Sequence, residues 1–206
     1  MVIPRRRLPH VYVEGKALFL TWHLHGSLPA SHFPPPGKFS AGQAFVWIDR
    51  YLDAAQTGPT YLRRPEIARI VLNSIYKGVE LSHYDLHSFV IMSNHVHMLI
   101  DARIHPSQIM RSLKGFTARE ANLALGLTGQ SFWQKESYDH WVRDDREFER
   151  IRIYIENRRS TGRVSVVKRG VEMSLYAART SACATKAYAA FGIATVFGCS
   201  PAFAST

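Results

Sequence analysis

Cysteine, acidic residues and long apolar runs are all scarce in this chain of 206 residues. Its only two cysteines, Cys183 and Cys199, lie near the C-terminal end. They provide neither a disulfide framework nor a zinc-finger spacing, so a reducing, cytoplasmic environment is expected. No long apolar run follows the basic residues 1–10, and we therefore expect neither a signal peptide nor a membrane span.

The shortage of acidic residues leaves the chain strongly basic. It has 26 Lys and Arg against 16 Asp and Glu, a net charge of +10. This balance favours a polyanionic partner, and nucleic acid is the leading candidate, although an ordinary protein can also be basic. Hydrophobic residues make up 46% of the chain and aromatic residues 12%, which is enough for a folded core.

The apolar patterns predict four strands and four helices. Aromatic and β-branched residues predict strands at 11–24, 81–92, 95–101 and 130–142. Helical spacing predicts helices at 44–55, 65–78, 106–125 and after a capping box formed by Asp144 and Glu147. This order predicts an α+β fold, a ferredoxin-like sandwich with an antiparallel sheet and helices packed on one face.

Small residues dominate the end of the chain. We expect one domain at residues 1–162 and, at residues 163–206, a tail that is basic and then rich in Ala, Ser and Thr. Because the tail has no sustained apolar period, it is expected to be poorly ordered.

A pair of histidines separated by one apolar residue is the first candidate site. Side chains alternate faces along a strand, so His95 and His97 would point the same way while Val96 and Met98 point into the core. Two imidazoles on one strand face can share a divalent cation. Taken alone, the pattern also fits two half-exposed histidines.

Tyr154 is the candidate nucleophile on the last predicted helix. Arg150 and Arg158 lie one turn away. A phenol beside guanidinium groups and a divalent cation ionises more easily and can attack phosphorus. Tyr154 could instead pack at the helix edge. Tyr138 is a competing nucleophile, but its aromatic neighbours favour a role in the core or in base stacking.

Cations and aromatic residues are interleaved after the histidine pair. This mixture suits single-stranded or hairpin DNA, because phosphates attract charge and unpaired bases stack on flat rings. A single helical arginine is more often simply solvated. The candidate DNA-binding residues are Arg111, Lys114, Arg119, Trp133, Arg143, Arg150 and Arg158.

Several motifs in order resemble the IS200-like tyrosine transposases, and most closely their REP-associated branch. They are residues 20–29 (LTWHLHGSLP), 93–99 (SNHVHML), 131–140 (SFWQKESYDH), 142–144 (VRD) and 154–157 (YIEN). The resemblance, which covers residues 8–162, implies an HUH endonuclease in which His95 and His97 bind Mg²⁺ or Mn²⁺ and Tyr154 is the nucleophile. It also implies a single-stranded DNA substrate with a hairpin from a repetitive extragenic palindrome (REP), and a covalent 5′-phosphotyrosine intermediate.

The chain departs from this family at one position. Arg158 stands where the family usually has an Asn or Gln that completes the metal site, and a guanidinium has no lone pair for a cation. Asn157 is our candidate third ligand, with Glu156 or a water as alternatives. The protein could also be a catalytically impaired binder of DNA hairpins. A zinc hydrolase using His23, His25, His95 and His97 is a further alternative, and both a monomer and a homodimer remain compatible with the sequence.

Overall fold

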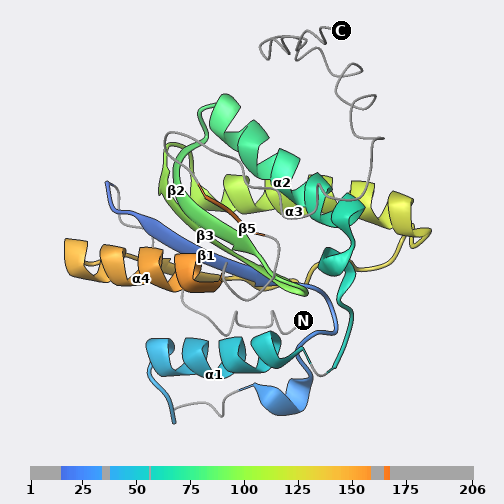
Figure 1. The fold of residues 1–206 in the computed structure, drawn as a ribbon, viewed down its shortest axis with the longest axis horizontal. Coiled ribbons are helices and arrows are strands. Elements are labelled where there is room, and N and C mark those ends of the chain that lie inside the picture. The colour runs from blue at the N-terminus through green and yellow to red at the C-terminus, as the bar shows by residue number, and fades with distance from the viewer. Residues whose placement is uncertain (1–14, 34–37, 56, 159–164, 168–206) are drawn as a thin grey trace, which may run out of the picture. The chain divides into compact units, whose positions relative to one another are not determined.

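Figure 1 shows the fold as a computed structural model, which describes residues 15–33, 38–55, 57–158 and 165–167. The chain divides into two units, residues 1–176 and 177–206, and all described residues lie in the first. The elements in chain order are β1 (Leu18–His23), η1 (Ala30–His32), α1 (Ala41–Ala54), η2 (Tyr61–Arg63), α2 (Pro65–Glu80), β2 (Tyr84–Ile91), β3 (His95–Ala102), α3 (Pro106–Leu125), β4 (Tyr138–Trp141), α4 (Asp145–Asn157) and β5 (Ser165–Val167).

The strands form one antiparallel sheet in the order β4-β1-β3-β2-β5. The first four strands, with α2 and α3 as their connections, have the β-α-β-β-α-β arrangement of ferredoxin-like folds. The predicted α+β class is therefore confirmed. Helix α1 is an additional element between β1 and α2.

Helices cover both faces of this sheet, so the expectation of helices on one face is wrong (Figure 1). Helices α2 and α3 pack on the face that carries Leu20, Trp22 and Met98. Helices α1 and α4 pack on the opposite face, around Phe19 and Leu99. The physical reason is that β1 is buried along its whole length. A strand whose side chains are buried on both faces needs cover on both.

Several element boundaries also differ from the expected ones. Strand β4 is only Tyr138–Trp141, whereas a strand was expected at 130–142. Phe132 and Trp133 instead turn into the core beneath α3, and only Leu24 and Trp133 form an isolated bridge. Strand β5 lies within the segment expected to be a tail, and the rest of residues 163–206 lies outside the described residues.

The start of α4 follows the predicted capping pattern. The Asp144 side chain accepts a hydrogen bond from the Glu147 backbone N–H at 2.7 Å. The Glu147 carboxylate in turn accepts one from the Arg143 N–H at 2.9 Å. This cap fixes where α4 begins, and therefore which side chains face the sheet one to three turns later. No helix among the described residues is long and apolar enough to cross a membrane.

The contact between α2 and β2 yields a stability prediction. A Cβ at Gly78 would overlap the ring of Tyr84, which is buried and donates a hydrogen bond to the Ile75 carbonyl at 2.6 Å. Gly78→Ala should lower the free energy of unfolding by about 1–3 kcal/mol, because the overpacking outweighs the gain in helix propensity. Denaturant titration measures this change.

Gly115 in α3 is the matched control. A Cβ there meets nothing within 4 Å, so Gly115→Ala should stabilise the protein by up to about 1 kcal/mol. Equal effects of the two substitutions would contradict the packing of Tyr84 against α2.

Candidate active site

Two buried histidines lie side by side on the sheet face that α1 and α4 cover. His95 and His97 belong to β3, which is flanked by β1 and β2, and both side chains are fully buried. Their Nε2 atoms are 3.1 Å apart. Because strand side chains alternate, Val96 and Met98 point to the other face and pack in the core, as expected from the sequence.

Hydrogen bonds to the other ring nitrogens orient both imidazoles. Asn94 donates through Nδ2 to the Leu52 carbonyl of α1, so its Oδ1 is free to accept from His95 Nδ1 at 2.7 Å. His97 Nδ1 shares a hydrogen bond with Thr21 Oγ1 at 2.8 Å. With the proton of His95 on Nδ1, its Nε2 lone pair faces the neighbouring imidazole, which is how supporting residues prepare metal-ligating histidines.

Asp49 of α1 places a carboxylate oxygen at the histidine pair. Its Oδ1 is 3.1 Å from His97 Nε2 and 3.7 Å from His95 Nε2. Asp49 is 3% exposed, and within the described part of the chain its Oδ1 has no partner with hydrogen-bond geometry. A buried carboxylate oxygen that faces two imidazole nitrogens is costly unless one nitrogen carries a proton toward it or a cation lies between them.

The three groups fit a divalent cation. Each offers one ligand atom, and the three atoms lie within 4.8 Å of one another. Burial opposes ionisation of Asp49, but the close approach of His97 and the charge of Arg158 hold the pKa of the carboxyl well below its usual range. Burial and the neighbouring His97 keep the pKa of His95 well below 6.5, so this imidazole is neutral, as a ligand must be.

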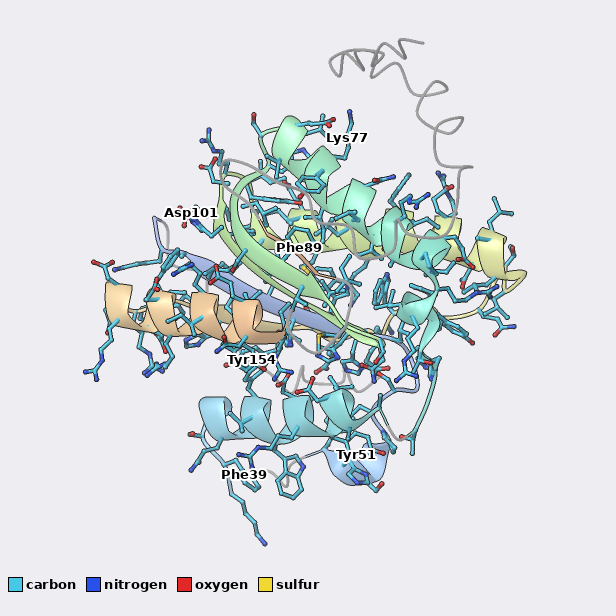
Figure 2. All side chains as sticks on the ribbon, in the orientation of Figure 1. Phe39, Tyr51, Lys77, Phe89, Asp101 and Tyr154 are labelled. Carbon is cyan, nitrogen blue, oxygen red and sulfur yellow. The ribbon has the colours of Figure 1, made fainter. Side chains whose placement is uncertain are left out.

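Tyr154 and Arg158 reach the same carboxylate from α4. Figure 2 shows Tyr154 between α4 and α1, where its hydroxyl donates to Asp49 Oδ2. Arg158 lies one turn further along, and its Nη2 is 2.5 Å from both Asp49 Oδ2 and the Tyr154 hydroxyl oxygen. Its Nη1 donates to Asp53 of α1, and its guanidinium carbon lies 4.3 Å from the centre of the Tyr154 ring.

The surroundings of Tyr154 keep its phenol protonated. Burial raises the pKa of Tyr154, and the Asp49 carboxylate raises it further, while Arg158 acts in the opposite direction. The charge of the single guanidinium therefore does not cancel the rise in the Tyr154 pKa that burial and the carboxylate cause. More positive charge near Asp49 is needed before the phenol ionises at neutral pH.

Asn157, the expected third ligand, is an exposed residue at the end of α4. Asp49, which the sequence analysis did not single out, lies at the histidine pair instead. One signal was available: Asp49 and Asp53 are four residues apart in a predicted helix whose apolar stripe is Phe45, Ile48 and Leu52. A carboxylate that interrupts an apolar stripe is either paired or functional.

The competing candidates are placed elsewhere. Tyr138 stacks on Phe45 with ring centres 4.6 Å apart, and burial, helped by Glu147, raises the pKa of Tyr138 to about 12. The four-histidine zinc site is not assembled: His25 is exposed, and His23 Nδ1 contacts the Leu24 carbonyl and Ser27. Within the described residues, the group of His, Cys, Asp and Glu that could hold a metal is Asp49, His95 and His97.

Three of the proposed DNA contacts have other roles. The prediction of a stacking role for Trp133 is wrong, because Trp133 is 7% exposed, packs on Trp22 and donates to Thr117 Oγ1 at 2.8 Å. Lys114 donates to the Gln134 and Lys135 carbonyls. Arg158 is engaged with Asp49 and Asp53, as described above.

The other arginines lie on two sides of the sheet. Arg111 and Arg119 are exposed on α3, which covers the face opposite the histidine pair. Arg143 and Arg150 are exposed at the start of α4, on the same face as the histidines. Among the predicted residues, only Arg143 and Arg150 are thus exposed cations on the sheet face that carries the histidine pair.

The match to known proteins begins after α1. Residues 60–158 match the family model described as "Transposase IS200 like", a range that contains the histidine pair, Tyr154 and Arg158 but neither Asp49 nor Asp53. No curated protein matches the chain.

Two solved structures of transposases are similar to this chain. A REP-associated tyrosine transposase bound to a REP hairpin is 14% identical, with a TM-score of 0.49 over 76% of this chain and 74% of that one. A protein of Deinococcus radiodurans R1, named provisionally as a transposase, is 18% identical, with a TM-score of 0.36 over 74% of this chain and 97% of that one. Both TM-scores are below 0.5, so the likeness to IS200-like transposases is carried by the match of residues 60–158.

The geometry makes a prediction about metal binding. Loss of a residue that supports a metal ligand typically weakens metal binding ten- to hundredfold, or about 1.4–3 kcal/mol. Asp49→Asn removes a ligand itself and should therefore weaken Mn²⁺ binding by more than this. Asn157→Ala, on the exposed end of α4, should leave the affinity unchanged. Calorimetric titration of the metal-free variants measures both. If Asn157→Ala weakens binding and Asp49→Asn does not, the expectation from the sequence is right and the site assigned here is wrong.

Proposed function

We propose that the protein is a metal-dependent transposase that cleaves single-stranded DNA through Tyr154, because residues 60–158 match the model of the IS200-like transposase family. The observation that carries the proposal is the convergence of a tyrosine hydroxyl, two imidazole nitrogens and a carboxylate on one buried point. As the sequence motifs imply, the substrate is a single strand that carries a REP-type hairpin.

Tyr154 is the nucleophile of this reaction. Its oxygen forms a bond to the phosphorus of the cleaved phosphodiester, and the bond from phosphorus to the 3′ oxygen breaks. The products are a 5′-phosphotyrosine link and a free 3′ hydroxyl. Asp49 holds the phenol through the hydrogen bond to Oδ2, and Arg158 places a fixed positive charge within reach of both the phenol oxygen and an incoming phosphate.

His95, His97 and Asp49 would hold the cation. When bound, a divalent cation polarises a phosphodiester oxygen and offsets the carboxylate charge that raises the pKa of Tyr154. Two imidazoles and one carboxylate suit Mn²⁺ better than Mg²⁺, which prefers oxygen ligands throughout. Mn²⁺ is therefore the ion of choice for the experiments.

DNA entry requires a movement of α1. The two histidines are fully buried, and the cavity that adjoins Asp49 has about 30 Å³ of free volume. A water needs about 10–15 Å³ by this measure, so the cavity has room for a few waters and not for a nucleotide. We expect α1, with Asp49, to shift when a strand binds.

The covalent step gives the first test of this function. With Mn²⁺ and a hairpin oligonucleotide, the protein should form an adduct that survives SDS, and a label at the 3′ end of the DNA should stay with the protein. A label at the 5′ end should be released, because the tyrosine is joined to the downstream fragment. Tyr154→Phe removes only the hydroxyl and should abolish the adduct.

Tyr138→Phe is the matched control and should keep the adduct, because the Tyr138 ring stacks on Phe45, whereas the hydroxyl that donates to Asp49 belongs to Tyr154. Loss of the adduct in Tyr138→Phe, with retention in Tyr154→Phe, would show that the nucleophile is misassigned.

The ion pair of Arg158 favours a second candidate, a DNA-hairpin binder with little or no cleavage. The guanidinium already compensates Asp49 and Asp53, which reduces the gain from binding a cation. Repulsion between the guanidinium and a nearby cation is of the order of 1–4 kcal/mol for an intermediate dielectric.

Arg158→Asn separates the two candidates. In an active enzyme it should tighten Mn²⁺ binding by about tenfold or more and raise the rate of adduct formation at limiting Mn²⁺. Calorimetry and a timed adduct assay measure the two effects. Unchanged metal affinity with no adduct in either protein would support the binder that does not cleave.

A further inference from the structure

We propose that the outer side of α1 and the segment before it form a stacking surface for the unpaired bases of single-stranded DNA. This α1 aromatic surface consists of His32, Phe39, Trp47 and Tyr51, with Lys38 and Arg50 as its cations. The inference rests on the proposed function only for the class of ligand. It assigns a role to residues that lie outside the segment matching the transposase family.

Two large rings of this surface are open to solvent. Trp47 is 48% exposed and Phe39 is 37% exposed, and their ring centres are 5.7 Å apart. Figure 2 shows Phe39 on the side of α1 that faces away from the sheet. The inner side of the same helix holds Phe45 against the core and Asp49 against the histidines. The outer rings therefore serve neither the core nor the metal site.

The exposed rings are held in fixed orientations. Trp47 Nε1–H donates to the His32 carbonyl at 3.1 Å. The His32 and Tyr51 rings lie 4.0 Å apart, and the Tyr51 hydroxyl is hydrogen-bonded to Thr57 at 2.7 Å. A ring that is fixed by its edge and exposed on its face loses little conformational entropy when a base stacks on it. Base–aromatic stacking accepts any base, because every base has a π-face.

The charge of the surface selects a polyanion. Lys38 and Arg50 are exposed and are the sequence neighbours of Phe39 and Tyr51, whereas the two acidic residues of α1, Asp49 and Asp53, are paired with Arg158 on the inner side. Among the described residues 38–54 there is thus no exposed acidic side chain. A second copy docking face to face would bring like charges together, whereas a DNA strand would bring phosphates to the cations and bases to the rings.

The surface is also close to the chemistry. Arg50 directly follows Asp49, and a helix with its side chains is about 10–12 Å across. A strand lying on the outer side of α1 is therefore about one helix diameter from the Tyr154 hydroxyl. Such a strand would bind next to the point of cleavage and would contact α1, the helix that covers the site.

The experiment compares the full-length protein with Trp47→Ala and Phe39→Ala, using a short oligothymidine without secondary structure and an abasic strand of the same length. Loss of one stacked base should weaken oligothymidine binding at least fivefold in each variant. Abasic binding should be unchanged, and so should the salt dependence, because stacking releases no counterions. Trp47→Phe should retain most of the affinity. Leu123→Ala, at an exposed apolar residue of α3, is the matched control and should retain all of it.

Tryptophan emission provides a second readout that does not depend on the stability of the variants. Oligothymidine should quench the emission of the parent protein more strongly than that of Trp47→Phe, since Trp22 and Trp133 are buried and the half-buried Trp141 belongs to β4 and not to the α1 aromatic surface. Unchanged oligothymidine affinity in Trp47→Ala and Phe39→Ala would overturn the proposal, as would variants that become monomeric with DNA binding unchanged, which would assign the surface to a second copy. Failure of the Tyr154 adduct together with intact Trp47-dependent binding would contradict the proposed function and leave this inference standing.

Discussion

The arrangement of the site depends on the Asp49 carboxylate, whose two oxygens contact different groups. Oδ1 faces His95 and His97, and Oδ2 accepts from Tyr154 and Arg158. One charge thus links the candidate metal position to Tyr154, the proposed nucleophile. Because the carboxylate is buried, its negative charge must be compensated at both oxygens. This requirement holds the two histidines at Oδ1, and Tyr154 and Arg158 at Oδ2.

The sheet provides the rigid part of this arrangement. Strand β3 lies between β1 and β2, so the histidines cannot change register without moving the core residues on the opposite face. Helix α1 is the part that we expect to move when DNA binds, and Asn94 joins it to the sheet through the Leu52 carbonyl. A site built from a central strand and a covering helix can be precise and still open to a large substrate, since only the helix has to move.

The sequence was a good guide wherever a pattern is local. The alternation around His95 and His97, the cap at Asp144 and the helix at Pro106–Leu125 are local patterns, and they were predicted correctly. Asp49 was missed because its function depends on contacts across more than 40 residues of chain, which no spacing reveals. Long-range packing also explains why α1 and α4 cover the second face of the sheet and why Trp133 is buried, and neither feature was predicted.

Sequence patterns also could not distinguish a cation that binds DNA from one that pairs with an acid. Arg158 and Arg150 are both arginines of one helix, but Arg158 points toward the acids of α1 and Arg150 toward solvent. The two arginines differ because α1, which is distant in the sequence, lies beside Arg158 and supplies its acidic partners.

The most direct test of the account is an anomalous diffraction map of crystals soaked in Mn²⁺. We predict one strong peak within bonding distance of His95 Nε2, His97 Nε2 and Asp49 Oδ1, with Tyr154 still adjacent to Oδ2. A peak bound by Asn157, or no peak at the histidine pair at a Mn²⁺ concentration that saturates the protein in solution, would contradict the central role of Asp49.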